Sequence, residues 1–171
     1  PPINYLDKQS SKKFEFSGQT FIGFTIEEEI YIKFKDKMLR EGWILVAGEP
    51  PKGTENRPVL EIKPKKTKGS KNSIKPDAVF LKTNKLLILE FKDKFSKEDE
   101  TRMINLIESE PLKVSLKEAI EEKDSIKNQF SLPFDKYQIK TGLVNNDHDS
   151  EVSDKLVHYC LDKNSEFIQK N

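Results

Sequence analysis

Three polar residues near the middle of the chain have the types and spacing that a hydrolytic metal site needs. Asp77 follows Pro76, Glu90 comes thirteen positions after Asp77, and Lys92 stands two positions beyond Glu90. Alternate side chains of a strand share a face, so Glu90 and Lys92 are expected to point the same way while Phe91 turns into the packing. Carboxylate oxygens suit Mg²⁺ or Mn²⁺ rather than zinc, and a neighbouring lysine can orient an attacking water. The spacing therefore predicts a Mg²⁺ site in which Mn²⁺ can substitute.

The residues around this trio predict where it lies in the fold. Two apolar runs of strand length, 78–81 and 86–89, are separated by a short polar turn at 83–85. The trio then falls at the start of one buried strand and at the end of the next. The alternative is an ordinary hairpin with a surface salt bridge between Glu90 and a nearby lysine, Lys92 or Lys94. A charged pair that ends a wholly apolar strand is costly, however, unless something binds there.

Pro76-Asp77 followed by Glu90-Phe91-Lys92 resembles the motif of the PD-(D/E)xK nuclease superfamily. The resemblance extends from about residue 27 to residue 92. It implies the α/β class with a restriction-endonuclease-like core, in which a central mixed β-sheet is flanked by helices in αβββαβ order. It also implies that Asp77 and Glu90 hold one or two metal ions with the backbone carbonyl of Phe91, and that Lys92 positions the water. In many members an acid from the opening helix joins the metal cluster.

Three consecutive glutamates at the start of the first predicted helix are candidates for that additional acid. Successive helical residues are rotated by about 100°, so Glu27, Glu28 and Glu29 cannot all face the site. On a helical wheel Glu27 falls within the apolar face, Glu28 lies at its border and Glu29 faces away. We therefore predict Glu27 as a catalytic residue, with Glu28 as its substitute in binding metal. Three acids in a first helical turn are also explained by the helix macrodipole alone, and for Glu29 we prefer that reading.

Positive charge is concentrated just before the motif. The whole chain has a formal net charge of +1, yet residues 61–97 hold eleven basic and four acidic side chains. Most of these bases form one lysine-rich run, which we expect to be a loop that leads directly into Asp77. Such a loop can hold the phosphates that the acids repel, although it can equally be a solvated loop without a ligand. The predicted nucleic-acid contacts are Lys63, Lys65, Lys66, Lys68, Lys71 and Lys75.

Apolar periodicity and capping residues predict the remaining elements. A helix capped by Thr25 is expected to end at Gly42, and a second helix should run from a capping box at Ser96 and Asp99 to about Glu108. A third helix is expected to begin at Ser115 after an interruption at Pro111. The predicted extended segments are 14–24, 43–47, 59–62, 137–144 and 156–161.

The length of 171 residues suits one domain. We divide it into an N-terminal arm (1–24), a core that carries the motif (25–110) and a C-terminal helix with added strands (111–171). No apolar run reaches the length of a membrane span, so no membrane contact is expected. The single cysteine, Cys160, excludes an intramolecular disulfide and suits a reducing, cytoplasmic setting.

Together these features predict a Mg²⁺-dependent endonuclease that hydrolyses phosphodiester bonds. The resemblance favours DNA over RNA as the substrate, in restriction-type or other DNA-processing cleavage. One alternative is a ribonuclease of the same superfamily, of the toxin or cap-snatching type. Another is a non-catalytic module that binds nucleic acid through the lysine run at 63–75. A homodimer and a longer multidomain parent chain both remain open.

Overall fold

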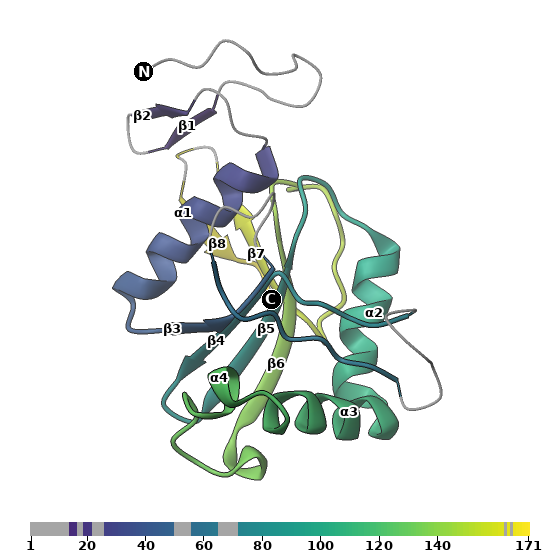
Figure 1. Ribbon diagram of the computed structural model, residues 1–171. Coiled ribbons are helices and arrows are strands. Elements are labelled where there is room, and N and C mark those ends of the chain that lie inside the picture. The colour runs from purple at the N-terminus through teal and green to yellow at the C-terminus, as the bar shows by residue number, and fades with distance from the viewer. Residues whose placement is uncertain are drawn as a thin grey trace.

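A six-stranded mixed β-sheet forms the centre of the computed structural model (Figure 1), which describes residues 14–16, 19–21, 26–49, 56–64, 72–162, 164 and 166–171. The spatial order of its strands is β3-β4-β5-β6-β7-β8. These strands are β3 (Ile44–Ala47), β4 (Ala78–Lys82), β5 (Lys85–Phe91), β6 (Gln138–Asn145), β7 (Val157–Leu161) and β8 (Phe167–Gln169). The helices are α1 (Ile26–Arg40), α2 (Lys97–Glu108), α3 (Glu110–Glu121) and α4 (Asp124–Lys127), with a 3₁₀ turn, η2, at Phe134–Lys136.

The strand directions follow from the connections between them. β3, β4 and β5 form an antiparallel meander, and β4 and β5 are joined by the two-residue turn Thr83–Asn84. β6 is parallel to β5, and the chain between them contains α2, α3 and α4, as a parallel crossover requires. β7 is parallel to β6, and β8 returns antiparallel at the edge. The prediction of an α/β fold with a mixed sheet flanked by helices is confirmed.

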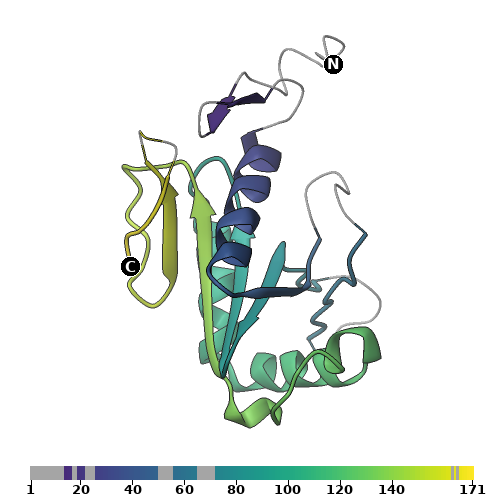
Figure 2. The ribbon, with the colours of Figure 1, turned by 90° about the vertical axis from the view of Figure 1, so that its left-hand side faces the viewer.

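Helices cover the two faces of the sheet separately. α1 packs on one face against Phe80, Leu87 and Leu89, whereas α2, α3 and α4 pack on the other face against residues such as Ile88 and Leu143. Figure 2 shows α3 running across the lower end of the sheet and the β7–β8 pair at one edge. Successive side chains of β5 alternate between these two apolar layers. Near Phe91, the strand is therefore covered by α1 on one face of the sheet and by α2 on the other.

Aromatic contacts attach α1 firmly to its face of the sheet. Phe34 makes edge-to-face contacts with four rings, at centroid distances of 6.1 Å to Phe80, 5.6 Å to Phe91, 4.9 Å to Tyr159 and 5.3 Å to Phe167. Such pairs each contribute about 0.5–1.5 kcal/mol beyond the area that they bury. This packing holds the first turn of α1 at the end of β5 that carries Glu90.

The predicted start of the third helix is wrong. α3 begins at Glu110 and is capped by Ser109, whose hydroxyl accepts from the amide of Leu112 at 3.4 Å. Pro111 lies in the first turn, where its missing N–H costs nothing, so it starts the helix rather than interrupting it. Ser115 is buried in mid-helix and donates to the carbonyl of Pro111 at 3.0 Å. The start of α2 is as predicted, because Ser96 accepts from the amide of Asp99 at 3.3 Å.

The predicted strand at 59–62 is also wrong, since this segment contributes only an isolated bridge between Ile62 and Ile74. Leu60 and Ile62 are fully buried. The alternation of apolar and polar residues in this segment therefore reflects packing onto the apolar layer under α2 and α3 rather than strand pairing.

The sequence analysis also missed β8, a strand of three residues with one buried apolar side chain, Phe167. Of the predicted arm, only β1 (Phe14–Phe16) and β2 (Gln19–Phe21) are described, as an antiparallel pair. The predicted cap at Thr25 lies outside the described residues.

No helix within the described ranges combines the length and the apolar character needed to cross a membrane.

Candidate functional site

Asp77 and Glu90 lie side by side at one end of the β4–β5 hairpin. Ala78 pairs with Leu89 in the antiparallel register, which puts the residue before β4 opposite Glu90. The backbone amide of Phe91 donates to Oδ2 of Asp77 at 2.7 Å, and the carboxyl groups of Asp77 and Glu90 are hydrogen-bonded to each other. The two acids that the sequence singled out as metal ligands therefore converge.

Gly48 allows the backbone of Asp77 to lie against the end of β3. A Cβ atom built on Gly48 would lie 2.5 Å from the carbonyl oxygen of Asp77, closer than real Cβ contacts come. The next residue, Glu49, donates its amide to that same oxygen at 3.1 Å. The close approach of the two backbone segments thus requires glycine at position 48. The sequence analysis missed this role. The available signal was a glycine directly after a predicted strand.

Burial raises the pKa of both carboxyl groups. The pKa of Asp77 is raised by desolvation, and the Phe91 amide offsets part of this rise. The pKa of Glu90 is raised by desolvation and then by the neighbouring Asp77. Glu90 is buried and Asp77 is partly buried. Two adjacent carboxyls in such surroundings do not both ionise unless a positive charge joins them, so the pair holds either a shared proton or a cation.

These donors fit a small divalent cation. Mg²⁺ is bound through one or two carboxylates and keeps several waters, so it needs no cage made wholly of side chains. In the described part of the chain, no three Asp, Glu, His or Cys side chains are grouped to hold a metal. The remaining positions would fall to water and to a main-chain oxygen, for which the carbonyl of Phe91 stays the predicted donor.

Glu27 and Lys92 are close enough to this pair to act on it electrostatically. Burial raises the pKa of the half-buried Glu27, and the charge of Lys92 partly offsets that rise. The charges of Glu27 and Lys92 also act on Asp77, in opposite directions. Lys92 is exposed and lies just after β5 rather than within the strand, and its amide donates to the carbonyl of Val144 at 3.0 Å. All four predicted catalytic residues are thus gathered at one end of the hairpin.

The prediction that Glu29 faces away from the core is wrong. Glu29 is fully buried and Glu28 is 4% exposed, whereas Glu27 is only half-buried. Desolvation, followed by the charge of Glu28, raises the pKa of Glu29 to about 8. Neither carboxyl oxygen of Glu29 has a hydrogen-bond partner among the described residues. The helical wheel failed because tertiary packing covers more of the first turn of α1 than its apolar stripe indicates. The substitute role of Glu28 remains a prediction.

Asp99 is a buried acid that sequence reasoning treated only as a capping residue. It is 5% exposed, and its charge contributes to the raised pKa of Glu90 and of Glu27. Its Oδ1 atom accepts from Arg102 at 3.1 Å, while Oδ2 is buried without a hydrogen-bond partner in the described ranges. Asp99 lines the same small hollow as Glu90 and Lys92. The spacing of three between Asp99 and Arg102 was the signal for this ion pair.

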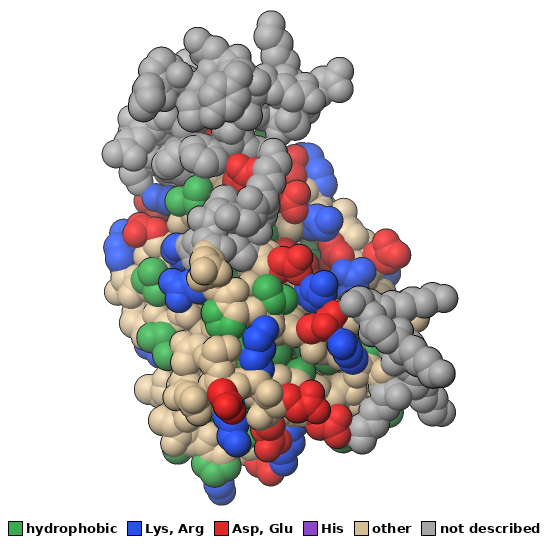
Figure 3. Space-filling view, viewed as in Figure 1, with side chains coloured by type: hydrophobic (Ala, Val, Ile, Leu, Met, Phe, Trp, Pro, Cys, Tyr) green, Lys and Arg blue, Asp and Glu red, His purple; other side chains and the backbone are tan. Residues whose placement is uncertain are grey.

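The two described members of the lysine-rich run are partly neutralised. Lys63 and Lys75 lie 3.5 Å and 3.8 Å from the carboxylate of Glu61, which also accepts from the hydroxyl of Ser73 at 3.0 Å. The Ser73 hydrogen bond and then the lysines lower the pKa of Glu61. Acidic and basic side chains are interspersed on the face in Figure 3. The other predicted nucleic-acid contacts, Lys65, Lys66, Lys68 and Lys71, lie outside the described residues.

No family model, no curated protein and no solved structure matches this chain.

Proposed function

We propose that this chain is a Mg²⁺-dependent endonuclease of the PD-(D/E)xK type that hydrolyses phosphodiester bonds, with DNA as the preferred polymer. The observation that carries the proposal is the Asp77–Glu90 pair, in which Glu90 is buried and Asp77 is partly buried, the two carboxyls share a hydrogen bond, and the Phe91 amide donates to Asp77 at 2.7 Å. Paired carboxyls with raised pKa values are typical of functional sites, because they are unfavourable without a ligand.

The arrangement of elements supports a restriction-endonuclease-like core as part of this proposal. α1 precedes the antiparallel strands β3, β4 and β5, and α2 leads through two further helices to the parallel strand β6. If the three helices between β5 and β6 are counted as one helical crossover, this order is compatible with the αβββαβ order that the motif resemblance implies. Asp77 and Glu90 stand at the ends of β4 and β5, the positions that the motif requires.

Each residue of the site has a separate role in the proposed reaction. Bound Mg²⁺ supplies Lewis acidity and positive charge to the scissile phosphate. Asp77 and Glu90 would hold the cation through their carboxylate oxygens. Lys92 orients the attacking water, and Glu27 adds negative charge near Lys92 and Asp77. The charge of Asp99 contributes to the raised pKa of Glu90, and the charge of Arg102 lowers that pKa.

A plasmid-nicking assay tests the proposal. The protein should nick supercoiled DNA with Mg²⁺ or Mn²⁺ and not with EDTA. Asp77→Asn and Glu90→Gln should each lower the rate by about 100-fold or more, since each removes a group that acts on the reacting phosphate. Lys127→Gln, which changes an exposed lysine of α4, is the matched control and should keep full activity. Cleavage that persists in EDTA or in Asp77→Asn would contradict the proposal.

The same assay separates the alternatives that the sequence left open. Cleavage of an RNA strand but not of DNA, with the same dependence on metal and Asp77, would assign a ribonuclease. Salt-sensitive binding without cleavage, unaffected by EDTA and by Asp77→Asn, would indicate a binding module. In that case neutralising the three lysines Lys65, Lys66 and Lys68 should weaken binding, because each phosphate contact adds to the counterions released.

A further inference from the structure

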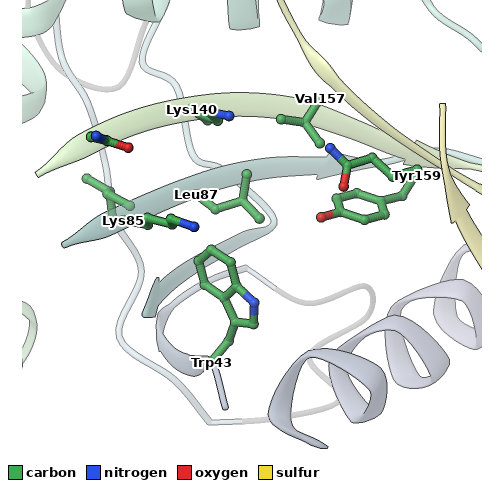
Figure 4. Close-up of a pocket in the computed structure, with 9 residues that line it drawn as sticks. Trp43, Lys85, Leu87, Lys140, Val157 and Tyr159 are labelled. Atoms are coloured by element: carbon green, nitrogen blue, oxygen red, sulfur yellow. The ribbon is translucent and has the colours of Figure 1, made fainter. Parts of the chain in front are cut away.

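A second hollow lies at the opposite end of β5 from the candidate site. It has a volume of about 140 Å³ and opens on the α1 face of the sheet, beside the turn where α1 ends. Figure 4 shows the Trp43 indole extending toward Leu87, with Lys85 on one side of the indole and Tyr159 on the other. We refer to this hollow as the Trp43 pocket. Its labelled lining residues are Trp43, Lys85, Leu87, Lys140, Val157 and Tyr159.

The register of the sheet explains why polar side chains gather there. Lys85 is paired with Gln138 and Leu87 with Lys140 across the parallel strands β5 and β6, so all four belong to one face. Further along this face α1 covers the strands with apolar side chains, but the helix ends at Arg40 and leaves the beginnings of β5 and β6 open. Tyr159 is held at the far side of the pocket by its ring contact with Phe34.

The pocket has an excess of positive charge. Lys85 and Lys140 form no ion pair with any residue that the structure describes. At the rim, Lys82 donates to the carbonyl of Glu41 at 2.6 Å and lies 6.0 Å from the Trp43 ring. No acidic residue in the described part of the chain lines this pocket, although Glu41 acts electrostatically on Tyr159 and is itself paired with Lys37.

Two larger hollows among the described residues differ from the Trp43 pocket in how their charged side chains are paired. One is lined by the acids Glu61, Glu118 and Glu122 together with Lys63 and Lys123, and the other by Glu98 together with Lys97 and Arg102. The basic residues of both hollows already have partners. Lys63 lies 3.5 Å from Glu61, Lys123 donates to the carbonyl of Val59 at 2.8 Å, Lys97 lies 2.6 Å from Glu100 and Arg102 lies 3.1 Å from Asp99. In the Trp43 pocket, Lys85 and Lys140 have no such partner among the described residues, and they lie beside two aromatic rings. Among the three, the Trp43 pocket alone has the composition that suits an anion with a planar ring.

We propose that the Trp43 pocket binds a nucleoside 5′-phosphate, either as a free nucleoside monophosphate or as the 5′-phosphorylated end of a strand. The Lys85 and Lys140 ammonium groups bind the phosphate, and the base stacks on Trp43 or Tyr159. Gln138 and Gln169, which also line the pocket, can donate to and accept from the edge of a base. Lys85 lies five residues from Glu90 on one strand, about 17 Å at the rise of an extended chain. The ligand therefore does not enter the candidate active site.

The single tryptophan of the chain gives a direct measure of binding. Adenosine monophosphate is titrated while Trp43 emission is followed with excitation at the red edge of absorption, and calorimetry provides a second signal. We expect a saturable change, and affinity about tenfold lower in Lys85→Ala and in Lys140→Ala, since each loses one charged contact. Lys127→Ala should bind like the unmodified protein. Asp77→Asn should also bind normally, which separates this proposal from the proposed nuclease activity.

Inorganic phosphate and a 5′-phosphorylated oligonucleotide identify the ligand more closely. If the oligonucleotide competes with adenosine monophosphate, the strand end is the source, and if it does not, the free nucleotide is. If inorganic phosphate alone binds as tightly as the nucleotide, the proposed role of the rings is wrong. The proposal is overturned if the folded protein shows no saturable signal at millimolar nucleotide, or if both lysine variants bind unchanged.

Discussion

The backbone amide of Phe91 donates a 2.7 Å hydrogen bond to the carboxylate of Asp77, fourteen positions earlier in the chain. Phe91 is itself fixed from the α1 side by edge-to-face contacts with Tyr31 at 5.4 Å and Phe34 at 5.6 Å. The apolar packing of α1 thus positions the backbone group that orients the acid. The proposed function depends on this link between packing and chemistry.

Removing the positive charge of Lys92 should lower the cleavage rate without unfolding the protein. Lys92 is exposed, so Lys92→Gln should change the melting temperature little, whereas the water that it positions would lose its partner. We expect a rate at least tenfold lower in single-turnover cleavage, with an unchanged circular dichroism spectrum. Lys127→Gln controls for the general loss of a surface charge. Equal rates for the two variants would remove Lys92 from the mechanism.

The metal-free protein should become less stable as the pH rises. Burial raises the pKa of Asp77 and Glu90 in the folded state, so folding retains protons that the unfolded chain releases from about pH 4 upward. The native state then binds more protons than the unfolded state, and the free energy of unfolding falls with increasing pH. Urea unfolding in EDTA from pH 5 to 9 checks this expectation.

Two changes should weaken that pH dependence. The double variant Asp77→Asn, Glu90→Gln lacks both titrating groups, so its free energy of unfolding should vary less with pH than that of the unmodified protein. Added Mn²⁺ should also offset the loss at high pH, because it binds the ionised pair in the native state. A pH dependence identical in the variant and the unmodified protein would show that these carboxyls are not the titrating groups.

Gly48 and Gly142 provide a matched pair for testing how Asp77 is positioned. A Cβ on Gly48 would lie 2.5 Å from the Asp77 carbonyl oxygen, and a Cβ on Gly142 would lie 2.3 Å from the carbonyl oxygen of Val157, between β6 and β7. Both alanine variants should lose about 1–3 kcal/mol of stability from overpacking. Only Gly48→Ala should lose activity at a temperature where both remain folded. If both variants, or neither, lose activity, the contact between Gly48 and Asp77 does not serve the site.

Glu29→Gln should stabilise the protein above neutral pH. Burial raises the pKa of Glu29 to about 8 in the folded protein. As the pH rises from the pKa of this carboxyl in the unfolded chain toward 8, Glu29 therefore lowers the free energy of unfolding increasingly. Glutamine carries no charge and removes that cost. The melting temperature at pH 9 should therefore be higher in Glu29→Gln, while Asp36→Asn on the exposed side of α1 should change it less. A lower melting temperature for Glu29→Gln at pH 9 would contradict this account.

The sequence predicted those parts of the fold that local pattern determines. The apolar runs of β4 and β5 and the Ser96 cap need only neighbouring residues, so these elements and the convergence of Asp77 with Glu90 followed from spacing. The segment 59–62 has the alternation of a strand, but only tertiary packing decides whether such a segment finds a paired neighbour.

Other features depend on contacts between elements distant in the chain. The burial of Glu29 and Asp99 depends on how α1 and α2 lie against the sheet, which helical periodicity cannot supply. The Trp43 pocket likewise exists because α1 ends before the sheet face does, and the sequence gives no sign that its two lysines lie close together. Asp99 and the Trp43 pocket were missed for this reason.

A crystal soaked in Mn²⁺ and measured for anomalous scattering tests the central claim most directly. The account predicts a single strong peak about 2.1 Å from one carboxylate oxygen of Asp77 and one of Glu90, with the hydrogen bond between the two carboxyls broken. Asp77→Asn crystals treated in the same way should show no peak there. The claim is contradicted if the soaked crystals keep the two carboxyls hydrogen-bonded to each other, with no anomalous peak in contact with either.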